Sequence, residues 1–470
     1  MMKIKDLKAD WQRELIPHHE PDMIYECIAC GHTYPLNQFL YTCPSCKNLL
    51  KLRDLGFDQL KKCPGETWRR IFDQRRLLNI PALKGIFLFH ELILPVVPLD
   101  YVIYLGEGHT PIVKTNEQLS SQVGIEFFIK YDGLNPSASF KDRGMASAIS
   151  FINYFIKRKG LGQVLGICAS TGDTSAAAAL YLAYLDHRKV KSVVLLPQGK
   201  VTSQQLSQPL GSGATVIEIP GVFDDCMKIV EELAERYQVV LLNSKNPIRI
   251  NGQKSFSYEV AQQFDYDSEN LVVIVPIGNA GNITALMEGF LDFYHLGIIA
   301  HLPRVIGVQS FHADPVYRWY QDGRYEPVKV KPSVAQAAMI GDPVSFPKVN
   351  QLVKEHFKEK FGVVQVTEQE IIEGMLMTNQ HGHIVCTQGG ESVAALKKAV
   401  QSGMVNQGDT VVVNSTSHQL KFADFQNRYY EDSFPEAYEI HPKNDMRNAP
   451  TQLPASAERI AEYLHLDERE

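Results

Sequence analysis

One lysine stands in the segment NPSASFKDRGM (135–145), after small residues and Phe140 and before an Asp-Arg pair. A lysine becomes a useful Schiff-base former when its environment lowers its pKa, because only the neutral amine attacks a carbonyl. A single lysine in such a segment is more often a surface cation. The hypothesis that Lys141 is catalytic therefore depends on the segments that accompany it.

Three further segments follow expected strands and carry groups suited to anions. ASTGDTS (169–175) offers hydroxyls and the free N–H groups of a helix N-terminus, which suit a substrate carboxylate, although a well-capped helix explains it equally well. PIGNAGNIT (276–284) has glycines that let the backbone approach a phosphate at a second helix N-terminus. NSKNPIR (243–249) ends in an arginine, which binds phosphate bidentately, or else forms an ordinary salt bridge in a loop. Together with Lys141, these segments indicate an enzyme that acts on a small molecule carrying a phosphate and a carboxylate.

Two cysteine pairs, Cys27/Cys30 and Cys43/Cys46, are separated by twelve residues. Each pair can present two thiolates from one tight turn, and two such turns make a tetrahedral zinc site with no open coordination position. The spacing is slightly shorter than that of most zinc ribbons but close to it. We expect a structural zinc ribbon; the alternative is a degenerate knuckle that binds no metal.

The candidate residues are placed by short β-branched runs that alternate with amphipathic stretches. Continuous apolar runs indicate strands buried on both faces, and their alternation with helices indicates doubly wound parallel sheets. The sequence thus predicts an α/β fold. The expected strands cover 164–170, 191–197, 215–219, 239–243, 271–278, 305–310 and 410–415, and the expected helices cover 174–188, 224–237, 282–295 and 456–466.

The composition of the 470-residue chain is that of an ordinary globular protein. Apolar residues make up 44% and charged residues 21%, and the net charge of −6 gives no sign of a nucleic-acid or membrane-surface binder. The charged N-terminus has no secretory signal, and no apolar run is long enough to span a bilayer. Eight cysteines, four of them in tight pairs, fit a reducing compartment with a metal site.

The motifs together resemble those of the threonine synthases, which are pyridoxal-phosphate (PLP) enzymes of fold type II, related to the tryptophan synthase β-subunit. Beside the segments above, the resemblance rests on GEGHTP (106–111), NPIRINGQKS (246–255), IGDPVS (340–345) and CTQGG (386–390), in the family's order. It runs from about Gly85 to Asp424 and implies two doubly wound open-sheet subdomains with an N-terminal zinc-ribbon-like segment. The implied reaction converts O-phospho-L-homoserine and water to L-threonine and phosphate, the work of a carbon–oxygen lyase.

The resemblance also implies a role for each matching residue. Lys141 would hold PLP and move protons at the substrate Cα and Cβ, Phe140 would stack on the pyridine ring, and Thr416 would face the ring nitrogen. The PLP phosphate would be cradled by Gly278, Asn279, Ala280, Gly281 and Asn282. The substrate carboxylate would be held by Ser170, Thr171 and Thr174, and the substrate phosphate by Asn243, Ser244 and Arg249.

Some positions depart from the family pattern. Asp173 stands where many relatives have an asparagine that donates to the PLP 3′-oxygen, a bond that an ionised aspartate cannot donate. ThrSerHisGlnLeuLys (416–421) lacks two glycines of the usual motif, and SerAla (137–138) replaces Thr-Gly. These departures affect the expected choice of substrate.

Two alternatives therefore stay open. Cysteate synthase, which joins phosphoserine and sulfite, resembles threonine synthases this closely; threonine dehydratase and cysteine synthase are more distant, and Arg249 weighs against them because their substrates carry no phosphate. The other alternative is a catalytically inactive PLP-fold binding protein, against which an intact Lys141 argues.

The expected domains are a zinc-ribbon-like segment (22–52), a helical connector (53–85), a catalytic domain (86–425) and a C-terminal appendage (426–470). Within the catalytic domain, the smaller subdomain is expected over about 140–245, and the larger over about 86–139 plus 246–425. The expected partner is a small-molecule substrate, without nucleic acid or membrane. We expect a cytoplasmic homodimer, since dimers are common in this fold.

Overall fold

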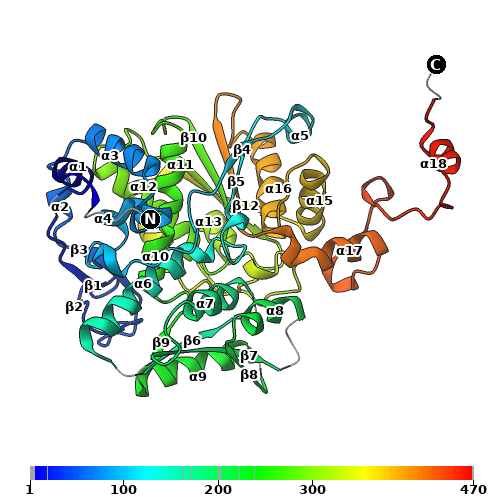
Figure 1. Cartoon of the computed structure of the whole chain (residues 1–470). Coiled ribbons are helices and arrows are strands. Elements are labelled where there is room, and N and C mark those ends of the chain that lie inside the picture. Colours follow the sequence, from blue (N-terminus) through cyan, green and yellow to red (C-terminus); the bar gives the residue numbers. More distant parts are fainter. Residues whose placement is uncertain are drawn as a thin grey trace.

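The computed structural model describes residues 6–467, apart from positions 18, 162, 171, 199–202, 222 and 238. Figure 1 shows the described chain as two layered α/β bodies, one above the other, with an N-terminal sheet at one side and a C-terminal segment that extends away at the other.

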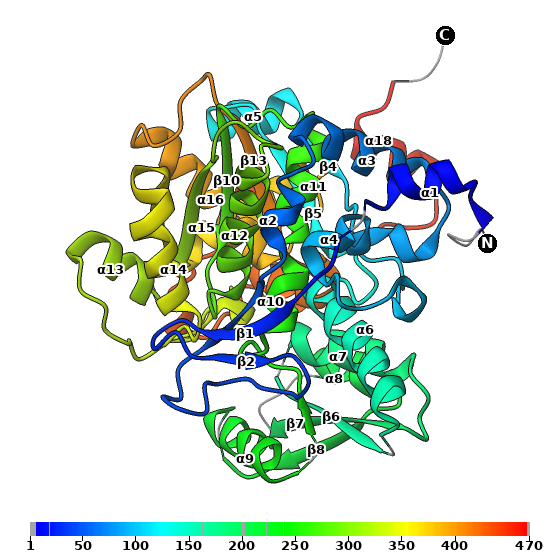
Figure 2. The ribbon, with the colours of Figure 1, turned by 90° about the vertical axis from the view of Figure 1, so that its left-hand side faces the viewer.

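The N-terminal sheet has three short antiparallel strands in the order β2-β1-β3. Its strands are β1 (Met23–Cys27), β2 (Thr33–Pro35) and β3 (Leu50–Asp54), and helix α1 (Ala9–Leu15) precedes them. Its core is small, with Tyr25, Cys27, Cys43 and Leu50 buried at the centre. Strand β3 packs against α10 (Pro247–Gln253), and Figure 2 shows β1 and β2 on the near side of the molecule.

A helical connector links this sheet to the main body. It contains α2 (Phe57–Leu60) and α3 (Gly65–Leu77), and α4 (His90–Ile93) follows it at the start of the catalytic body. One face of α3 buries Trp68, Ile71 and Phe72 in the largest hydrophobic core. Apolar burial at this spacing fixes the helix to the body.

The larger sheet has six strands in the order β12-β11-β10-β13-β5-β4, all parallel except the edge strand β4. Alternate residues of β10 face opposite cores: Val273 and Val275 join one, while Val272 and Ile274 join the other. Helices therefore cover both faces, as continuous apolar strands require. The strands are β4 (Ile112–Lys114), β5 (Phe128–Tyr131), β10 (Leu271–Pro276), β11 (Arg304–Ser310), β12 (Phe361–Val366) and β13 (Thr410–Ser415).

The helices around this sheet pack as two layers. Residues of α11 (Ser255–Gln263) and α12 (Gly281–His295) share one core, and residues of α15 (Glu368–Gln380) and α16 (Thr387–Gln401) share the other. The shorter helices are α5 (Glu117–Val123), α13 (Pro315–Asp322), α14 (Phe346–Leu352) and α17 (Ala423–Glu431).

The smaller sheet has four parallel strands in the order β8-β7-β6-β9. They are β6 (Val164–Ala169), β7 (Val190–Pro197), β8 (Thr215–Ile219) and β9 (Val239–Leu241). Helices α7 (Asp173–Ala183) and α8 (Ser203–Gly211) pack on one face and α9 (Phe223–Arg236) on the other. Helix α6 (Lys141–Lys159) leads into this body (Figure 1).

The predicted α/β fold and all seven predicted strands are confirmed, with ends that differ by up to two residues. The helix predicted over 174–188 ends at Ala183, because the N–H groups of Tyr184 and Leu185 bond to the carbonyls three residues before them and form a turn. Asp186 then accepts a hydrogen bond from the Arg188 N–H. Six strands of the described chain were not predicted: β1, β2 and β3 of the N-terminal sheet and β4, β5 and β12 of the larger sheet. Among the described residues, no helix combines the length and apolarity that a membrane span requires.

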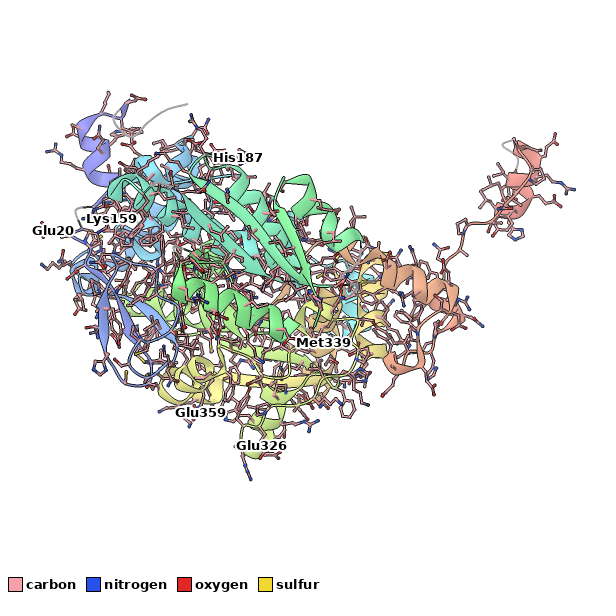
Figure 3. All side chains as sticks on the ribbon, turned by 90° about the horizontal axis from the view of Figure 1, so that it is seen from below. Glu20, Lys159, His187, Glu326, Met339 and Glu359 are labelled. Carbon is pink, nitrogen blue, oxygen red and sulfur yellow. The ribbon has the colours of Figure 1, made fainter. Side chains whose placement is uncertain are left out.

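The C-terminal segment stays against the body as far as Arg447, whose side chain donates to the Tyr430 carbonyl oxygen, and leaves the body after it. It ends in α18 (Ala457–Leu464), which buries no residue. Figure 3 shows this helix and its side chains standing apart from the rest of the molecule. The segment therefore contributes nothing to the cavity that the two sheets enclose.

Candidate active site

A cavity with an empty volume of about 650 Å³ lies where strand ends of the two sheets meet, as ligand sites do in open α/β sheets. Its lining combines segments that are far apart in the sequence. Among the predicted site residues, it is lined by Phe140, Lys141, Asp173, Ser244, Arg249, Gly278, Asn279, Ala280, Gly281, Asn282 and Thr416.

Lys141 is the first residue of α6, and its Nζ lies 4.3 Å from the centre of the Phe140 ring. The residue as a whole is partly exposed to the cavity, but dense packing desolvates its amine. This burial, followed by the positive charge of Arg249, lowers the pKa of Lys141 to about 8. A larger fraction of neutral amine is thus present near neutral pH than in a solvated lysine.

The turn between β10 and α12 forms another wall. Ala280 caps α12 with a φ of 60°, and a Cβ added to Gly281 would lie 2.8 Å from the Ile250 side chain. The side-chain nitrogen of Asn282 is buried without a partner among the described residues. This turn places the N-terminus of a fifteen-residue helix and an unused donor at the cavity, which suits a phosphate.

Arg249 lies on α10, whose first turn is capped by Asn246 accepting from the N–H groups of Ile248 and Arg249. Arg249 is only 1% exposed, and its Nη1 donates to the Leu242 carbonyl oxygen at 2.8 Å. Its Nε has no partner, and no carboxylate pairs with it among the described residues. Burial lowers the pKa of this guanidinium to about 10. A buried cation without a counter-ion calls for an anion in the cavity.

Asp173 begins α7 and is held by residues of the segment that follows β13 (Thr410–Ser415). It accepts a hydrogen bond from the Ser417 hydroxyl, and its Oδ1 lies 2.7 Å from Lys421 Nζ. In the same segment, the Thr416 carbonyl oxygen accepts from the Phe140 N–H at 2.8 Å. These contacts fasten the loop after β13 to the start of α6 and to the smaller sheet.

Three predicted substrate residues do not line the cavity. The amide of Asn243 is bonded to the backbone of Ala169, from whose N–H it accepts at 3.0 Å and to whose carbonyl it donates at 2.5 Å. Ser170 accepts from the Gly172 N–H at 3.2 Å, and Thr174 is buried in the first turn of α7. Thr171 lies outside the described residues. The roles predicted for these four residues stay predictions.

Two glutamines line the cavity that the sequence analysis did not single out, Gln253 and Gln388. Gln388 is 2% exposed, and both polar atoms of its side chain lack a partner among the described residues. The Oε1 of Gln253 is in the same state. The CTQGG segment was noticed for its polar turn, but only the fold shows that Gln388 faces Lys141 across one cavity.

Comparison with known proteins identifies the family. The profile described as "Pyridoxal-phosphate dependent enzyme" matches residues 103–417. The threonine synthase of Methanocaldococcus jannaschii is 35% identical over 414 residues, which are 87% of this chain and 96% of that protein. The chain belongs to the threonine synthase family.

Other relatives agree with this membership. Threonine synthase 2, chloroplastic, of Arabidopsis thaliana is 34% identical over 86% of this chain and 77% of its own length. Among solved structures, yeast threonine synthase superposes with a TM-score of 0.63 at 19% identity, covering 88% of this chain and 93% of that one. The Escherichia coli enzyme gives a TM-score of 0.61 at 20% identity over 88% and 91%. At these identities the structures establish the shared fold.

The cavity of this threonine synthase family member fits the cofactor of its family. A lysine with a lowered pKa faces the helix N-terminus of α12, and the glycines of the turn leave room that side chains would fill, since a Cβ on Gly278 would lie 3.1 Å from the Ala338 Cα. The unpartnered donor of Asn282 completes a phosphate cradle. These residues would hold PLP by its carbonyl carbon and its phosphate.

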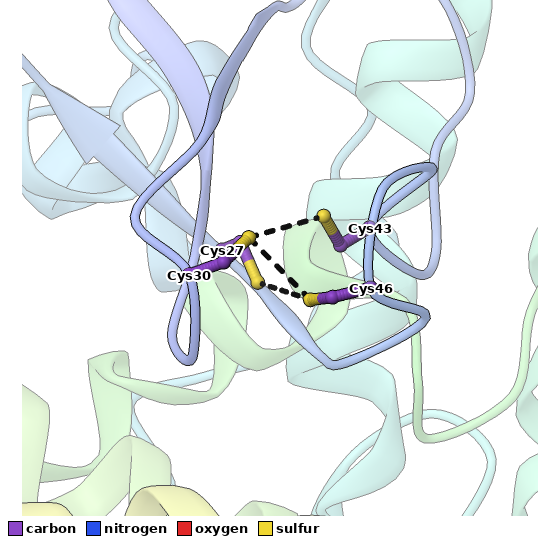
Figure 4. Close-up of side chains that lie close together, drawn as sticks. All are labelled: Cys27, Cys30, Cys43 and Cys46. Carbon is purple, nitrogen blue, oxygen red and sulfur yellow. Dashed lines mark hydrogen bonds between the residues drawn. The ribbon is translucent and has the colours of Figure 1, made fainter.

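The four paired cysteines also meet at one point (Figure 4). Cys27 is the last residue of β1 and Cys30 lies in the turn after it, and Cys43 and Cys46 come from the facing loop. Their sulfurs lie 3.4 to 3.6 Å apart in the three closest pairs, and all lie within 4.8 Å. Ligands about 2.3 Å from a tetrahedral zinc ion stand about 3.8 Å apart, so the donor set fits structural zinc.

Proposed function

We propose that the protein is a threonine synthase, a lyase that converts O-phospho-L-homoserine and water to L-threonine and phosphate. The observation that carries the proposal is Arg249, a buried guanidinium without a counter-ion in the cavity that contains Lys141. A substrate with a dianionic phosphate would supply the missing charge. Threonine dehydratase and cysteine synthase act on substrates without phosphate and would leave Arg249 unpaired.

The residues of the cavity divide into those that hold the cofactor and those that move protons. Bound PLP supplies an electron sink for deprotonation at the substrate Cα and Cβ. Lys141 would hold the cofactor and then carry protons at these two carbons, for which an amine with a pKa of about 8 is suited. The turn 278–282 would bind the cofactor phosphate, Phe140 would pack against its ring, and Thr416 would face the ring nitrogen.

The substrate would be bound at its two anionic ends. Arg249 and Ser244 would bind its phosphate, which leaves from Cγ. The start of α7, with Ser170, Thr171 and Thr174, would bind its carboxylate. Asp173, neutralised by Lys421, would accept a hydrogen bond from the cofactor's 3′-hydroxyl, which agrees with an aspartate where relatives have asparagine.

The decisive experiment is an assay of the purified protein with O-phosphohomoserine, in which phosphate release and threonine formation are measured together. We expect equal amounts of both products from the wild type and none from Lys141→Ala. Arg249→Met should raise the KM for O-phosphohomoserine tenfold or more, because hydrogen bonds to charged groups contribute about 1.5–3 kcal/mol each. The exposed Arg188 gives the control variant Arg188→Met, for which we expect no change.

Other outcomes would redirect or remove the proposal. A protein that binds PLP but leaves O-phosphohomoserine untouched would keep the cofactor and remove the substrate assignment. Turnover of phosphoserine with sulfite would instead identify a cysteate synthase. A protein that binds no PLP would overturn the whole proposal.

We also propose that the protein is a cytoplasmic homodimer divided into the domains expected from the sequence. The separate N-terminal sheet and the two larger sheets support the boundaries near 22–52, 53–85 and 86–425. The eight free cysteines support a reducing compartment. Light scattering on the purified protein tests the dimer, whose mass should be twice the 52.9 kDa of one chain.

A further inference from the structure

A second cavity, with an empty volume of about 440 Å³, lies against a neighbouring face of α10. Its walls come from four elements: β3 of the N-terminal sheet, α10, α12 and α14. Ile250 lines both this cavity and the active-site cavity, so one helix separates the two. None of the catalytic roles proposed above requires this second cavity.

Charged side chains surround the second cavity, and some of them already pair with one another. Lys254 Nζ lies 2.6 Å from Asp292 Oδ2, which also accepts from the Tyr258 hydroxyl at 2.6 Å. Lys51 Nζ lies 3.2 Å from Glu26 Oε1. Lys254 and Lys51 thus already have carboxylate partners, although Lys51 shares Glu26 with Arg53. Two charged residues of the lining have no such partner in the described part of the chain, Lys348 and Glu288.

Lys348 and Glu288 face the cavity from different helices, α14 and α12. Lys348 is only 5% exposed, yet within the described part of the chain it makes no hydrogen bond and no ion pair, and the same holds for Glu288. Burial lowers the pKa of Lys348, and the charge of Lys51 adds to this, while the charge of Glu288 opposes it. The two residues thus interact across the cavity without touching. An unpaired buried ammonium is costly, so a ligand that bridges them would be favoured.

The two unpaired charges define the chemistry of that ligand. A lone anion would satisfy Lys348 and leave Glu288 without a partner, and a lone cation would do the reverse. A zwitterion satisfies both, and the apolar surfaces of Leu52, Ile250 and Leu291 offer space for a short side chain. We propose that this cavity binds a free α-amino acid, whose carboxylate accepts from Lys348 and whose ammonium donates to Glu288.

The site lies against the same helix that carries Arg249 into the active cavity. An amino acid held between β3 and α10 would contact Ile250, one residue from Arg249 on the same helix. The site would also unite the N-terminal sheet with the catalytic body, because Lys51 and Leu52 form one of its walls.

Binding can be measured without turnover. The twenty proteinogenic L-amino acids would be added singly to the holoenzyme at millimolar concentration, and melting temperature and titration calorimetry would be recorded. We expect at least one to bind saturably to the wild type. Lys348→Met and Glu288→Gln should each weaken its affinity about tenfold or more, the effect of losing one charged hydrogen bond. Two analogues of that amino acid, one without the carboxylate and one without the ammonium group, should bind the wild type as weakly as the amino acid binds the two variants.

Lys354→Met, which removes an exposed lysine just beyond α14, serves as the matched control and should bind as the wild type does. The visible absorption of bound PLP should be unchanged in all three variants, which shows that they fold and that the active cavity is intact. An amino acid that binds Lys348→Met and Glu288→Gln as tightly as the wild type occupies another site and overturns the proposal. The same conclusion follows if none of the twenty binds. Because no outcome depends on catalysis, failure here is distinguishable from failure of the proposed activity.

Discussion

Lys141 combines two features that a catalytic lysine needs, access to a cavity and a desolvated amine. With a pKa of about 8, about one-tenth of the amine is neutral at pH 7, against about 1 in 2,500 for an unperturbed lysine. Only the neutral amine attacks the cofactor carbonyl. We therefore expect the rate at which apoenzyme captures PLP to rise with pH and to level off above about pH 8, followed by the visible absorption of the bound cofactor.

The Arg249 charge is the second cause of this low pKa. In Arg249→Met the midpoint of the capture profile should therefore move to higher pH, whereas in Arg188→Met it should stay. A wild-type midpoint near that of a solvated lysine, about 10.4, would contradict the desolvation of Lys141.

The buried amide of Gln388 has no hydrogen-bond partner among the described residues. Gln388→Leu removes no hydrogen bond among the described residues, so the free energy of unfolding should not fall. If its amide binds substrate or cofactor, kcat/KM should fall about 10- to 100-fold, the effect of losing about 1.5–3 kcal/mol. Chemical denaturation and steady-state kinetics measure the two quantities.

Gln309 provides the opposite case. It is fully buried, accepts from the N–H groups of Val316 and Tyr317 at 2.8 and 3.0 Å, and does not line the cavity. Gln309→Leu should lower the free energy of unfolding by about 2 kcal/mol, because one buried and one partly buried N–H donor lose their acceptor. Equal effects of the two substitutions would show that Gln388 is structural.

Short sequence motifs predicted most of the residues that line the active cavity, and each motif contributes one wall of it. Lys141, Arg249 and the 278–282 turn lie in short motifs whose residue types indicate an amine nucleophile and two anion sites without knowledge of the fold. Gln388 and Gln253 were missed because an amide has no distinctive local signal. Their importance follows from burial without a partner, which only the packed structure shows.

Helix α10 is the element on which both cavities depend. It packs against α6 at two glycines: a Cβ on Gly252 would lie 2.4 Å from the Arg143 carbonyl oxygen, and one on Gly144 would lie 2.9 Å from that of Arg249. This close approach of two helices fixes Arg249 relative to Lys141. A side chain at either glycine would push the two residues apart.

Asn243 acts between elements, since its amide ties the end of β6 to the segment that follows β9. Asn243→Ala should lower the free energy of unfolding by about 2–4 kcal/mol, because the N–H and the carbonyl of Ala169 both lose their partner. The KM for O-phosphohomoserine should change little. Its neighbour Ser244 lines the cavity, so Ser244→Ala should raise this KM and leave stability unchanged. A rise in KM with unchanged stability in Asn243→Ala would instead support the substrate contact predicted from the sequence.

The strands that were missed show where the apolar pattern fails. In β5, the run Phe128–Tyr131 is interrupted by Lys130, which is nonetheless fully buried because it donates to Glu259 and Gln263 at 2.8 Å each. Strand β12 follows the charged stretch KEHFKEK (354–360), which hides its beginning. A buried charge whose partner lies 129 residues away cannot be inferred from a local pattern.

Such buried charges also join the elements of the catalytic body. Arg143 at the start of α6 bonds Asp132, just after β5, at 2.7 Å and Glu259 on α11 at 2.5 Å. All three side chains are almost fully buried. Removing one member would leave its partners charged and unpaired, which costs several kcal/mol. The network holds the start of α6, and therefore Lys141, against the larger sheet.

The N-terminal sheet needs a different source of stability. Its few buried residues make a core too small to fold without a bound metal ion. We expect about one zinc ion per chain by elemental analysis, and Cys30→Ser or a strong chelator should remove it. The unclustered Cys63 gives the control variant Cys63→Ser, which should retain the metal. After metal loss, amide hydrogens of residues 23–54 should exchange rapidly, and the amino-acid binding proposed for the second cavity should disappear with the wall formed by Lys51 and Leu52.

Metal loss should leave the active cavity largely intact. Helix α10 keeps its contacts with α6 and α12, and no residue of the N-terminal sheet lines the active cavity. PLP absorption should therefore persist, and kcat/KM should fall by less than about tenfold, which corresponds to 1.4 kcal/mol. If cofactor and metal were lost together, the sheet would be part of the catalytic fold itself. If PLP stays bound while amino-acid binding is lost, the zinc-bound sheet serves the second cavity and has no role in catalysis.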